Sequence, residues 1–245
     1  MPLWPTKTAC SLLCIRHGVT EMNEYLSTNR FGSRGFVDPP LYDTRLTARG
    51  REQASIGLRN RLEKEHEKAK IDTIISSPLS RALATADLGL GDIQNVKCEV
   101  DPDIAERHYL SSDVGRPPSE LARDFPRFSE ALSTLPDNWW WQGTTEQANA
   151  AYTERLALQG GPGTELKGVA LPVEPQAHFI ARITRFRDKL VARQAANPEE
   201  RIAVVAHWGV HYSLLHGASL RNCEVVEARP ADLAGVIKSP PDAGG

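Results

Sequence analysis

The sequence predicts an α/β fold: a three-layer α/β/α sandwich with a mostly parallel central sheet and an inserted cap region. Short apolar runs within 12–15, 72–76 and 201–206 have the length and composition of buried strands. Each run ends at a turn that carries polar side chains. Between these runs lie longer segments whose apolar residues recur at helical spacing. Strands that alternate with helices in this way form parallel sheets covered on both faces.

The first predicted strand, residues 12–15, ends at Arg16 and His17, and Gly18 lets the chain turn. Ligands of α/β proteins bind at the carboxyl ends of such strands. A fixed positive charge beside an imidazole suits an anion, and an imidazole nitrogen can attack one. The alternative is an ordinary sheet strand that happens to end in polar residues.

The next segments predict a helix that begins within 19–25 and a long irregular loop over 27–44. The loop is rich in Gly, Pro, Asn and Asp, and loops of this length are often functional. An amphipathic helix follows up to residue 70, with Thr47 as its N-cap.

The second predicted strand, 72–76, meets Ser77 and Pro78 and then a helix. Proline is favoured in the first turn of a helix, so we expect Ser77 to cap it. Arg81 then lies in or next to the first turn, where backbone N–H groups favour anions. Its alternative role is a charge on the helix surface. A third strand is expected at 96–100.

The last predicted elements are an amphipathic helix over 176–194, a strand over 201–206 that ends at His207, and a helix that reaches residue 215. His207 can also be a histidine satisfied within the core. The parallel arrangement brings Arg16, His17, Arg81 and His207 to one edge of the sheet.

We expect one domain over 1–230, with an insertion over the sheet at about 111–175 and a flexible tail over 231–245. The insertion contains three consecutive tryptophans, 139–141. These side chains cannot all face one side of a helix or strand. They either pack the insertion onto the core or stack on a flat substrate, and the sequence leaves both roles open.

Composition excludes several classes of protein. The chain has 245 residues, 29 basic and 31 acidic, for a net charge of -2, which argues against a nucleic-acid partner. No apolar run reaches the roughly 18 residues of a membrane span, and the N-terminus lacks the pattern of a signal peptide. The four cysteines are scattered without a Cys-x-x-Cys pair, which predicts free thiols in a reducing compartment. We therefore expect a cytoplasmic protein.

Three motifs in the same order resemble the histidine phosphatase superfamily, in its phosphoglycerate mutase-like branch. They are Arg16-His17-Gly18 after the first strand, the stretch from Ser77 to Ala86 that contains Arg81, and the strand that ends at His207. The resemblance covers about 10–110 and 176–225, and the stretch from 111 to 175 matches poorly.

The resemblance implies that His17 is the nucleophile and forms a phosphohistidine. It implies that Arg16 and Arg81 hold phosphoryl oxygens, that His207 contacts the same group, and that Asn23 binds the phosphate. Physical chemistry agrees, because a neutral imidazole is a nucleophile near pH 7 and guanidinium groups offset the charge of the transition state.

Glu106 lies in the sequence Glu-Arg-His-Tyr, which resembles the position of the proton donor in this family. Its carboxyl group would protonate the leaving alkoxide and then activate water. The alternative is an ordinary loop glutamate. Arg107, Tyr109 and Arg116 are candidate contacts to the substrate. The scheme requires no metal or other cofactor, and its partner is a small phosphorylated metabolite.

Departures from the mutase pattern favour a phosphatase. Mutases continue after Glu-Arg-His-Tyr with a glycine and a lysine-bearing stretch, whereas this chain continues Leu-Ser-Ser-Asp-Val-Gly-Arg over 110–116. The loop after Asn23 also differs, and Trp208 follows His207 where the family commonly has glycine. A phosphoglycerate mutase and a non-catalytic phosphate-binding protein remain alternatives, and the oligomeric state stays open.

Overall fold

A five-stranded sheet forms the centre of the protein in a computed structural model that describes residues 12–31, 33–66, 70–140 and 174–241. The strand order is β3-β2-β4-β1-β5. Strands β3, β2, β4 and β1 run parallel, and β5 pairs antiparallel with β1 at the edge, so the prediction of a mostly parallel sheet is confirmed. The strands are β1 Leu12–Arg16, β2 Thr73–Ser76, β3 Lys97–Val100, β4 Ile202–Ala206 and β5 Val225–Ala228.

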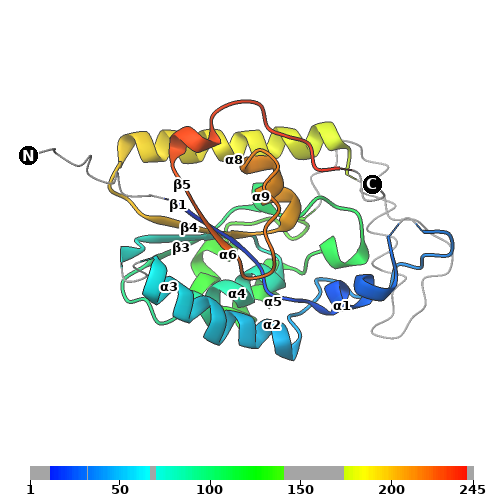
Figure 1. Cartoon of the computed structure of the whole chain (residues 1–245). Helices are drawn as coiled ribbons and strands as arrows, with labels where there is room; N and C mark the ends of the chain where they lie inside the picture. The colour runs from blue at the N-terminus through cyan, green and yellow to red at the C-terminus, as the bar shows by residue number, and fades with distance from the viewer. Residues whose placement is uncertain (1–11, 32, 67–69, 141–173, 242–245) are drawn as a thin grey trace, which may run out of the picture.

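Helices cover both faces of the sheet, which makes three layers (Figure 1). Helices α8 and α9 cover one face, and the helical segments within 48–90, together with α5 and α6, cover the other. The helices are α1 Glu21–Thr28, α2 Ala48–Glu52, the π-helical η1 Gln53–Leu58, α3 Arg59–Glu65, α4 Ser80–Leu90, α5 Pro118–Asp124, α6 Ser129–Leu132, α8 Gln176–Ala196 and α9 Trp208–Leu214, with 3₁₀ turns η3 Pro102–Ile104, η4 Ser111–Asp113, η5 Pro126–Phe128 and η6 Pro230–Leu233.

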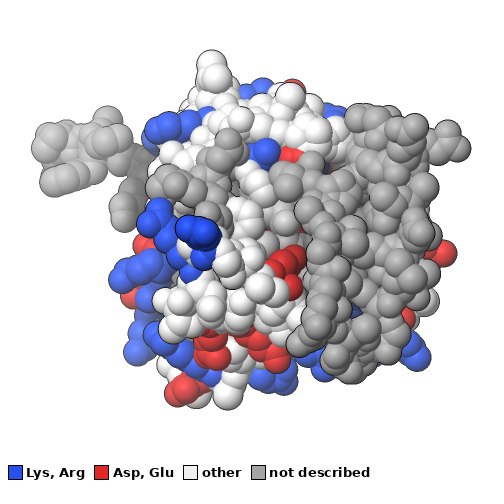
Figure 2. Space-filling view, turned by 90° about the vertical axis from the view of Figure 1, so that its right-hand side faces the viewer, with Lys and Arg blue, Asp and Glu red and all other residues white. Residues whose placement is uncertain are grey.

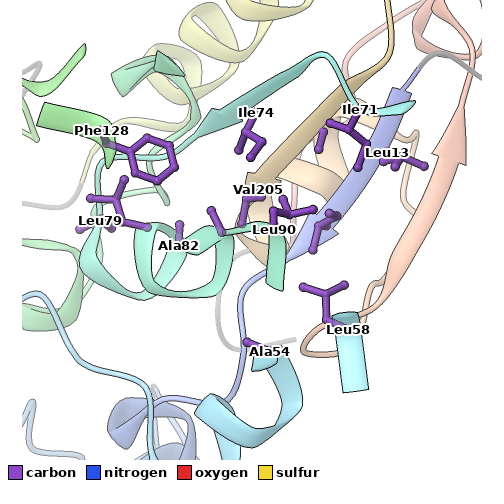
Figure 3. Close-up of a cluster of buried hydrophobic side chains, with 14 of the residues drawn as sticks. Leu13, Ala54, Leu58, Ile71, Ile74, Leu79, Ala82, Leu90, Phe128 and Val205 are labelled. Carbon is purple, nitrogen blue, oxygen red and sulfur yellow. The ribbon is translucent and has the colours of Figure 1, made fainter. Parts of the chain in front are cut away.

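Strand β1 separates two hydrophobic clusters because its side chains alternate between the faces of the sheet. Leu13 and Ile15 join the cluster beneath α4, which Figure 3 shows with Ile74, Val205 and Phe128. Leu12 and Cys14 join the opposite cluster, beneath α8 and α9. The site-bearing end of β1 is therefore held between two packed layers.

Part of the expected insertion belongs to the first of these clusters. Leu121, Phe128 and Leu132 are buried there, and Trp139 is 2% exposed. The Nε1 atom of Trp139 donates to the carbonyl oxygen of Arg116 at 2.9 Å. Trp139 therefore packs this segment onto the core. The remainder of the insertion, including the third tryptophan, lies outside the described residues.

The expected flexible tail is described over 231–241, and part of it packs against the core. Leu233 is 1% exposed and Ile237 is 7% exposed, and both pack in the cluster beneath α8. These two apolar side chains therefore have a place in the core, and the flexibility of the tail stays a prediction. Residues 242–245 lie outside the described part.

Helix α4 begins at Ser80, two residues later than Pro78, and its cap comes from a distant loop. The Oδ1 atom of Asp43 accepts from the backbone N–H of Ser80 at 2.7 Å. Ser77, which we expected to cap the helix, accepts from Leu79 N–H at 3.3 Å and also contacts His207. The single helix expected up to residue 70 is instead made of α2, the π-helical η1 and α3, and it ends at Glu65.

The face drawn in Figure 2 carries both signs of charge: basic side chains gather toward one margin, and acidic ones lie near the centre and lower edge among uncharged residues. Among the described residues, no helix is long and apolar enough to span a membrane.

Candidate active site

His17 and His207 meet at the carboxyl edge of the sheet because β1 and β4 are parallel neighbours in register. Arg16 pairs with Ala206, so His17, which follows Arg16, lies beside His207, which follows Ala206. The two imidazole rings have centroids 5.1 Å apart and are tilted by 57°. Both rings are buried. The structure thus brings together two histidines that are 190 residues apart in the chain.

The hydrogen bond of His17 determines which of its nitrogens can react. Its Nδ1 atom lies 2.8 Å from the carbonyl oxygen of Gly18, and a carbonyl can only accept, so we assign the proton to Nδ1. The Nε2 atom then keeps its lone pair. Burial, followed by the charges of Arg81 and Arg16, lowers the pKa of His17 well below its usual value. The ring is therefore neutral near pH 7 and can act as a nucleophile.

His207 has the opposite tautomer. The Nε atom of Arg81 donates to Nδ1 of His207 at 3.2 Å, so its proton lies on Nε2, which donates to the hydroxyl oxygen of Ser77 at 2.7 Å. Burial and the Arg81 charge lower the pKa of His207 well below its usual value. Arg81 thus orients His207 while remaining next to His17.

Two guanidinium groups supply positive charge at this edge. Arg81 is 3% exposed and also donates to the carbonyl oxygen of Ser112 at 2.6 Å and to Asp113 at 2.9 Å. Arg16 donates from Nη1 to the carbonyl oxygen of Leu220 at 2.7 Å, and its buried Nε atom has no hydrogen-bond partner among the described residues. Burial lowers the pKa of Arg16, and a guanidinium group still stays charged at neutral pH. The unpartnered N–H is available to an anion.

Glu106 lies on the same side of the pocket, with both carboxyl oxygens held by backbone N–H groups. The Oε1 atom accepts from Arg107 at 2.9 Å, and Oε2 accepts from Gly209 at 3.0 Å. A Cβ atom at position 209 would collide with this carboxyl group, which explains the glycine there. Burial raises the pKa of Glu106, and the charge of Asp113 raises it further. The carboxyl group is thereby suited to carrying a proton.

The backbone of the Glu106 turn is held from helix α8. Arg182 is 2% exposed and donates to the carbonyl oxygens of Asp103, Ala105 and Glu106 at 2.6 to 3.0 Å. It also pairs with both oxygens of Glu174, each at 2.8 Å. The sequence analysis missed this pair. The signal was present, since Arg182 falls on the apolar face of an amphipathic helix.

Asn23 lines the pocket, and its side-chain oxygen accepts from the backbone N–H of Thr20 at 3.2 Å and from Asn222 at 3.3 Å. Asn222 also donates to the carbonyl oxygen of His17 at 2.9 Å. It therefore ties the two pocket residues together, and no sequence motif pointed to it.

Among the three candidate substrate contacts, Arg107 and Tyr109 line the pocket, with the guanidinium of Arg107 4.4 Å from the centre of the Tyr109 ring. Arg116 does not line it. Its side chain instead pairs with Asp43 at 3.1 Å and Asp124 at 2.8 Å near the start of α4. The structure therefore does not support Arg116 as a substrate contact.

The pocket has a volume of about 400 Å³ and is lined by the polar groups described above and by a set of apolar side chains, which form its apolar wall. The residues of this wall belong to α1 and the loop after it, to the start of η4, to α9 and to the C-terminal segment. They are Met22, Leu26, Phe31, Leu110, Trp208, Pro240 and Pro241. No group of three or more candidate metal ligands occurs among the described residues.

Comparison with known proteins agrees with the fold. No curated protein sequence matches the chain. The alpha-ribazole phosphatase from Shigella flexneri superposes with a TM-score of 0.50 at 19% identity, over 95% of this chain and 96% of that one. Mycobacterial glucosyl-3-phosphoglycerate phosphatase gives 0.46 at 24% identity, over 87% of each chain. Phosphoglycerate mutase from Thermus thermophilus gives 0.44 at 19% identity, over 87% of this chain and 90% of that one.

The family comparison is more direct. The sequence profile of the histidine phosphatase superfamily (branch 1) matches residues 12–157, which is more than half of the chain. This match agrees with the motifs at Arg16-His17 and Arg81. The chain therefore belongs to the histidine phosphatase superfamily.

Proposed function

We propose that the protein is a phosphatase that hydrolyses a small phosphomonoester through a phosphohistidine on His17, with Glu106 as the proton donor. One observation carries the proposal. A neutral His17, with Nδ1 held by the Gly18 carbonyl and a lone pair on Nε2, lies beside the guanidinium groups of Arg16 and Arg81. This combination attracts an anion and attacks it.

In the first step the Nε2 lone pair of His17 attacks phosphorus and the ester P–O bond breaks. The proton of the Glu106 carboxyl group passes to the leaving alkoxide, so the alcohol departs neutral. Arg16 and Arg81 hold the phosphoryl oxygens and offset their charge, and His207 lies against the same group. The products of this step are the free alcohol, phosphohistidine at His17 and ionised Glu106.

In the second step a water molecule attacks the phosphorus of phosphohistidine. The Glu106 carboxylate takes a proton from that water, and the N–P bond breaks with its electron pair returning to Nε2. Orthophosphate leaves, and both His17 and Glu106 recover their starting protonation. The cycle needs no metal and no other cofactor.

A rapid-quench experiment tests the proposal. The protein is mixed with a ³²P-labelled phosphomonoester and quenched in alkali, and we expect label on the protein that is stable to alkali and lost in acid, as phosphohistidine is. His17→Ala should abolish both the label and phosphate release by more than about 10²-fold. His66→Asn is the control, because the carbonyl of His66 is bound by Arg201 at the opposite end of β4.

The alternatives give different results in the same assay. A mutase would move phosphate between hydroxyl groups of the substrate with little release. A non-catalytic binding protein would bind orthophosphate without turnover. A loss of less than 10²-fold in His17→Ala would exclude His17 as the nucleophile.

A further inference from the structure

Asp113 places a second carboxylate in the phosphate-binding pocket. It lines the same cavity as His17 and Glu106, and its side chain is 7% exposed. Its Oδ1 atom accepts from Nη2 of Arg81 at 2.9 Å. The residue belongs to the stretch 110–116 in which the sequence departs from the mutase pattern, and the catalytic scheme assigns it no step.

The carboxylate of Asp113 is fixed in place. Its Oδ2 atom accepts from the backbone N–H groups of Tyr109 at 3.2 Å and Leu110 at 3.0 Å. The turn that carries it is anchored in addition by Asp38, which accepts from the backbone and the hydroxyl of Ser111 at 2.8 and 2.9 Å. Asp113 therefore cannot swing away from Arg81 when a substrate arrives without breaking several hydrogen bonds.

This carboxylate changes the charge that a substrate meets. The phosphoryl group of the substrate would bind to the guanidinium groups of Arg16 and Arg81. The third guanidinium, Arg107, is 6% exposed, donates to the Glu174 carbonyl at 2.9 Å and lies over the Tyr109 ring. A second anionic group on the leaving alcohol would thus lie near Asp113 with little guanidinium surface to receive it. Like charges a few ångströms apart in a partly buried site repel strongly.

The apolar wall of the pocket favours an uncharged, apolar group. Phe31 packs edge-on against Tyr109, with ring centroids 5.9 Å apart, and the Trp208 ring lies against Tyr212 at 5.1 Å. Leu26 and Pro241 add aliphatic surface. Rigid aromatic and proline side chains of this kind bind a flat or apolar ring with small loss of conformational entropy.

We propose that Asp113 is a specificity-determining residue that restricts the enzyme to phosphomonoesters of uncharged alcohols, with a ring-bearing alcohol preferred by the apolar wall. This inference rests on the proposed phosphatase activity and narrows its substrate class. Phosphate esters that carry a carboxylate, such as phosphoglycerates, are excluded by repulsion from Asp113.

Two matched pairs of substrates test the proposal on the wild-type protein. Glycerol 3-phosphate and 3-phosphoglycerate differ only by a hydroxymethyl group in place of a carboxylate, and we expect kcat/KM to favour the former by about tenfold or more. Benzyl phosphate and methyl phosphate have alcohols of similar acidity and differ by a phenyl ring. We expect kcat/KM to favour benzyl phosphate by at least about tenfold.

The variant Asp113→Asn keeps the shape and removes the charge. We expect the preference for glycerol 3-phosphate over 3-phosphoglycerate to fall by about tenfold, through a lower KM for the carboxylated ester. Asp232→Asn is the control, because Asp232 also accepts from an arginine and from a backbone N–H, but on the surface within η6. Thermal melting verifies that each variant folds.

The outcomes separate the two proposals. If wild-type protein hydrolyses benzyl phosphate but cleaves 3-phosphoglycerate as well as glycerol 3-phosphate, the substrate class is wrong and the phosphatase activity stands. Should Asp113→Asn fold and keep the wild-type preference, Asp113 is not its cause. Hydrolysis of none of the four esters contradicts the phosphatase activity itself, and the inference falls with it.

Discussion

Arg182 and Glu106 are joined through the backbone: Nη2 of Arg182 donates to the carbonyl oxygen of Glu106 at 3.0 Å. The arginine comes from the middle of α8, and its charge is balanced by Glu174 in a two-oxygen pair. The proposed proton donor is thus held on one side by Arg182 and, through its carboxyl group, by the N–H of Gly209 on the other. The position of Glu106 therefore depends on contacts from two helices, α8 and α9.

Replacing Arg182 is therefore expected to affect both stability and catalysis. In Arg182→Met the buried Glu174 carboxylate loses its main partner, which costs about 3–5 kcal/mol in the free energy of unfolding. The Glu106 turn also loses three hydrogen bonds, so we expect kcat to fall more than KM rises. Urea unfolding and steady-state kinetics measure the two effects. Arg185→Met is the control, since Arg185 lies on the same helix, is 51% exposed and pairs with Asp103. Equal losses in both variants would contradict a specific role for Arg182.

As the proton donor, Glu106 should matter more for a substrate whose leaving group needs a proton. Because the alkoxide of benzyl phosphate needs a proton and p-nitrophenolate does not, Glu106→Gln should reduce the first turnover of benzyl phosphate by about 10²–10⁴-fold and that of p-nitrophenyl phosphate far less. Burst kinetics on both esters measure this difference. Glu120→Gln, at an exposed carboxylate that pairs with Arg116, should leave both rates unchanged.

The protonation of Glu106 should also determine how kcat/KM changes with pH. Burial raises the pKa of Glu106 above its ordinary 4.5, so its protonated form persists to higher pH than in water. The pKa values of His17 and His207 are lowered well below 6.5, so both rings are neutral at pH 6.5, where an ordinary histidine is half protonated. We expect kcat/KM for benzyl phosphate to fall on the alkaline side as Glu106 loses its proton. In Asp113→Asn that alkaline limb should move to lower pH, because the charge of Asp113 contributes to the raised pKa. An alkaline limb that stays in Glu106→Gln belongs to another group.

Reasoning from strand ends was sufficient to identify the residues at the centre of the site. Arg16, His17 and His207 follow apolar runs that become β1 and β4, and a parallel sheet brings the ends of such runs together. Contacts between distant loops were not predictable in the same way. Asn222 and Asp113 carry no local pattern that marks them, and their roles depend on how the turns after α9 and before α5 fold back toward His17 and Arg81.

Some errors came from local patterns that tertiary contacts override. The C-terminal segment, rich in Pro and Gly, was expected to be a flexible tail, and its Leu233 and Ile237 pack beneath α8, a contact that its composition does not indicate. Strand β5 was missed because a four-residue edge strand has little signal of its own. Arg116 was a candidate substrate contact, but its side chain pairs with Asp43 and does not line the pocket.

Removing the C-terminal residues that line the pocket should weaken substrate binding. Pro240 and Pro241 line the pocket, and Gln176 donates to the Pro240 carbonyl at 3.4 Å. A chain that ends after residue 238 keeps Leu233 and Ile237, so its melting temperature should stay within a few degrees of wild type. We expect KM for benzyl phosphate to rise by about threefold to tenfold with kcat little changed, because apolar contact is lost away from the reacting atoms. A chain that ends after residue 241 is the control and should match wild type.

Stability should decline in mild acid because of His211, which is fully buried in α9. Its Nε2 atom donates to the Ile15 carbonyl at 2.9 Å, and burial lowers its pKa from 6.5 to about 4. Between pH 4 and pH 6.5, His211 is protonated in the unfolded chain and neutral in the folded chain. The free energy of unfolding therefore falls as the pH drops from 6.5 toward 4, by about 3 kcal/mol from this group alone. His17 and His207 act in the same direction, and the raised pKa values of Glu106 and Asp43 act in the opposite one.

The contribution of His211 is isolated by comparing unfolding at pH 7 and pH 4.5 in wild type and in His211→Asn. The variant is expected to be less stable at pH 7, because the smaller side chain leaves space in the core, and its stability should depend less on pH. His216→Asn, at an exposed position whose positive φ of 54° suits asparagine, should keep the wild-type pH dependence. If His211→Asn loses as much stability on acidification as wild type, the acid sensitivity arises from the paired histidines of the active site.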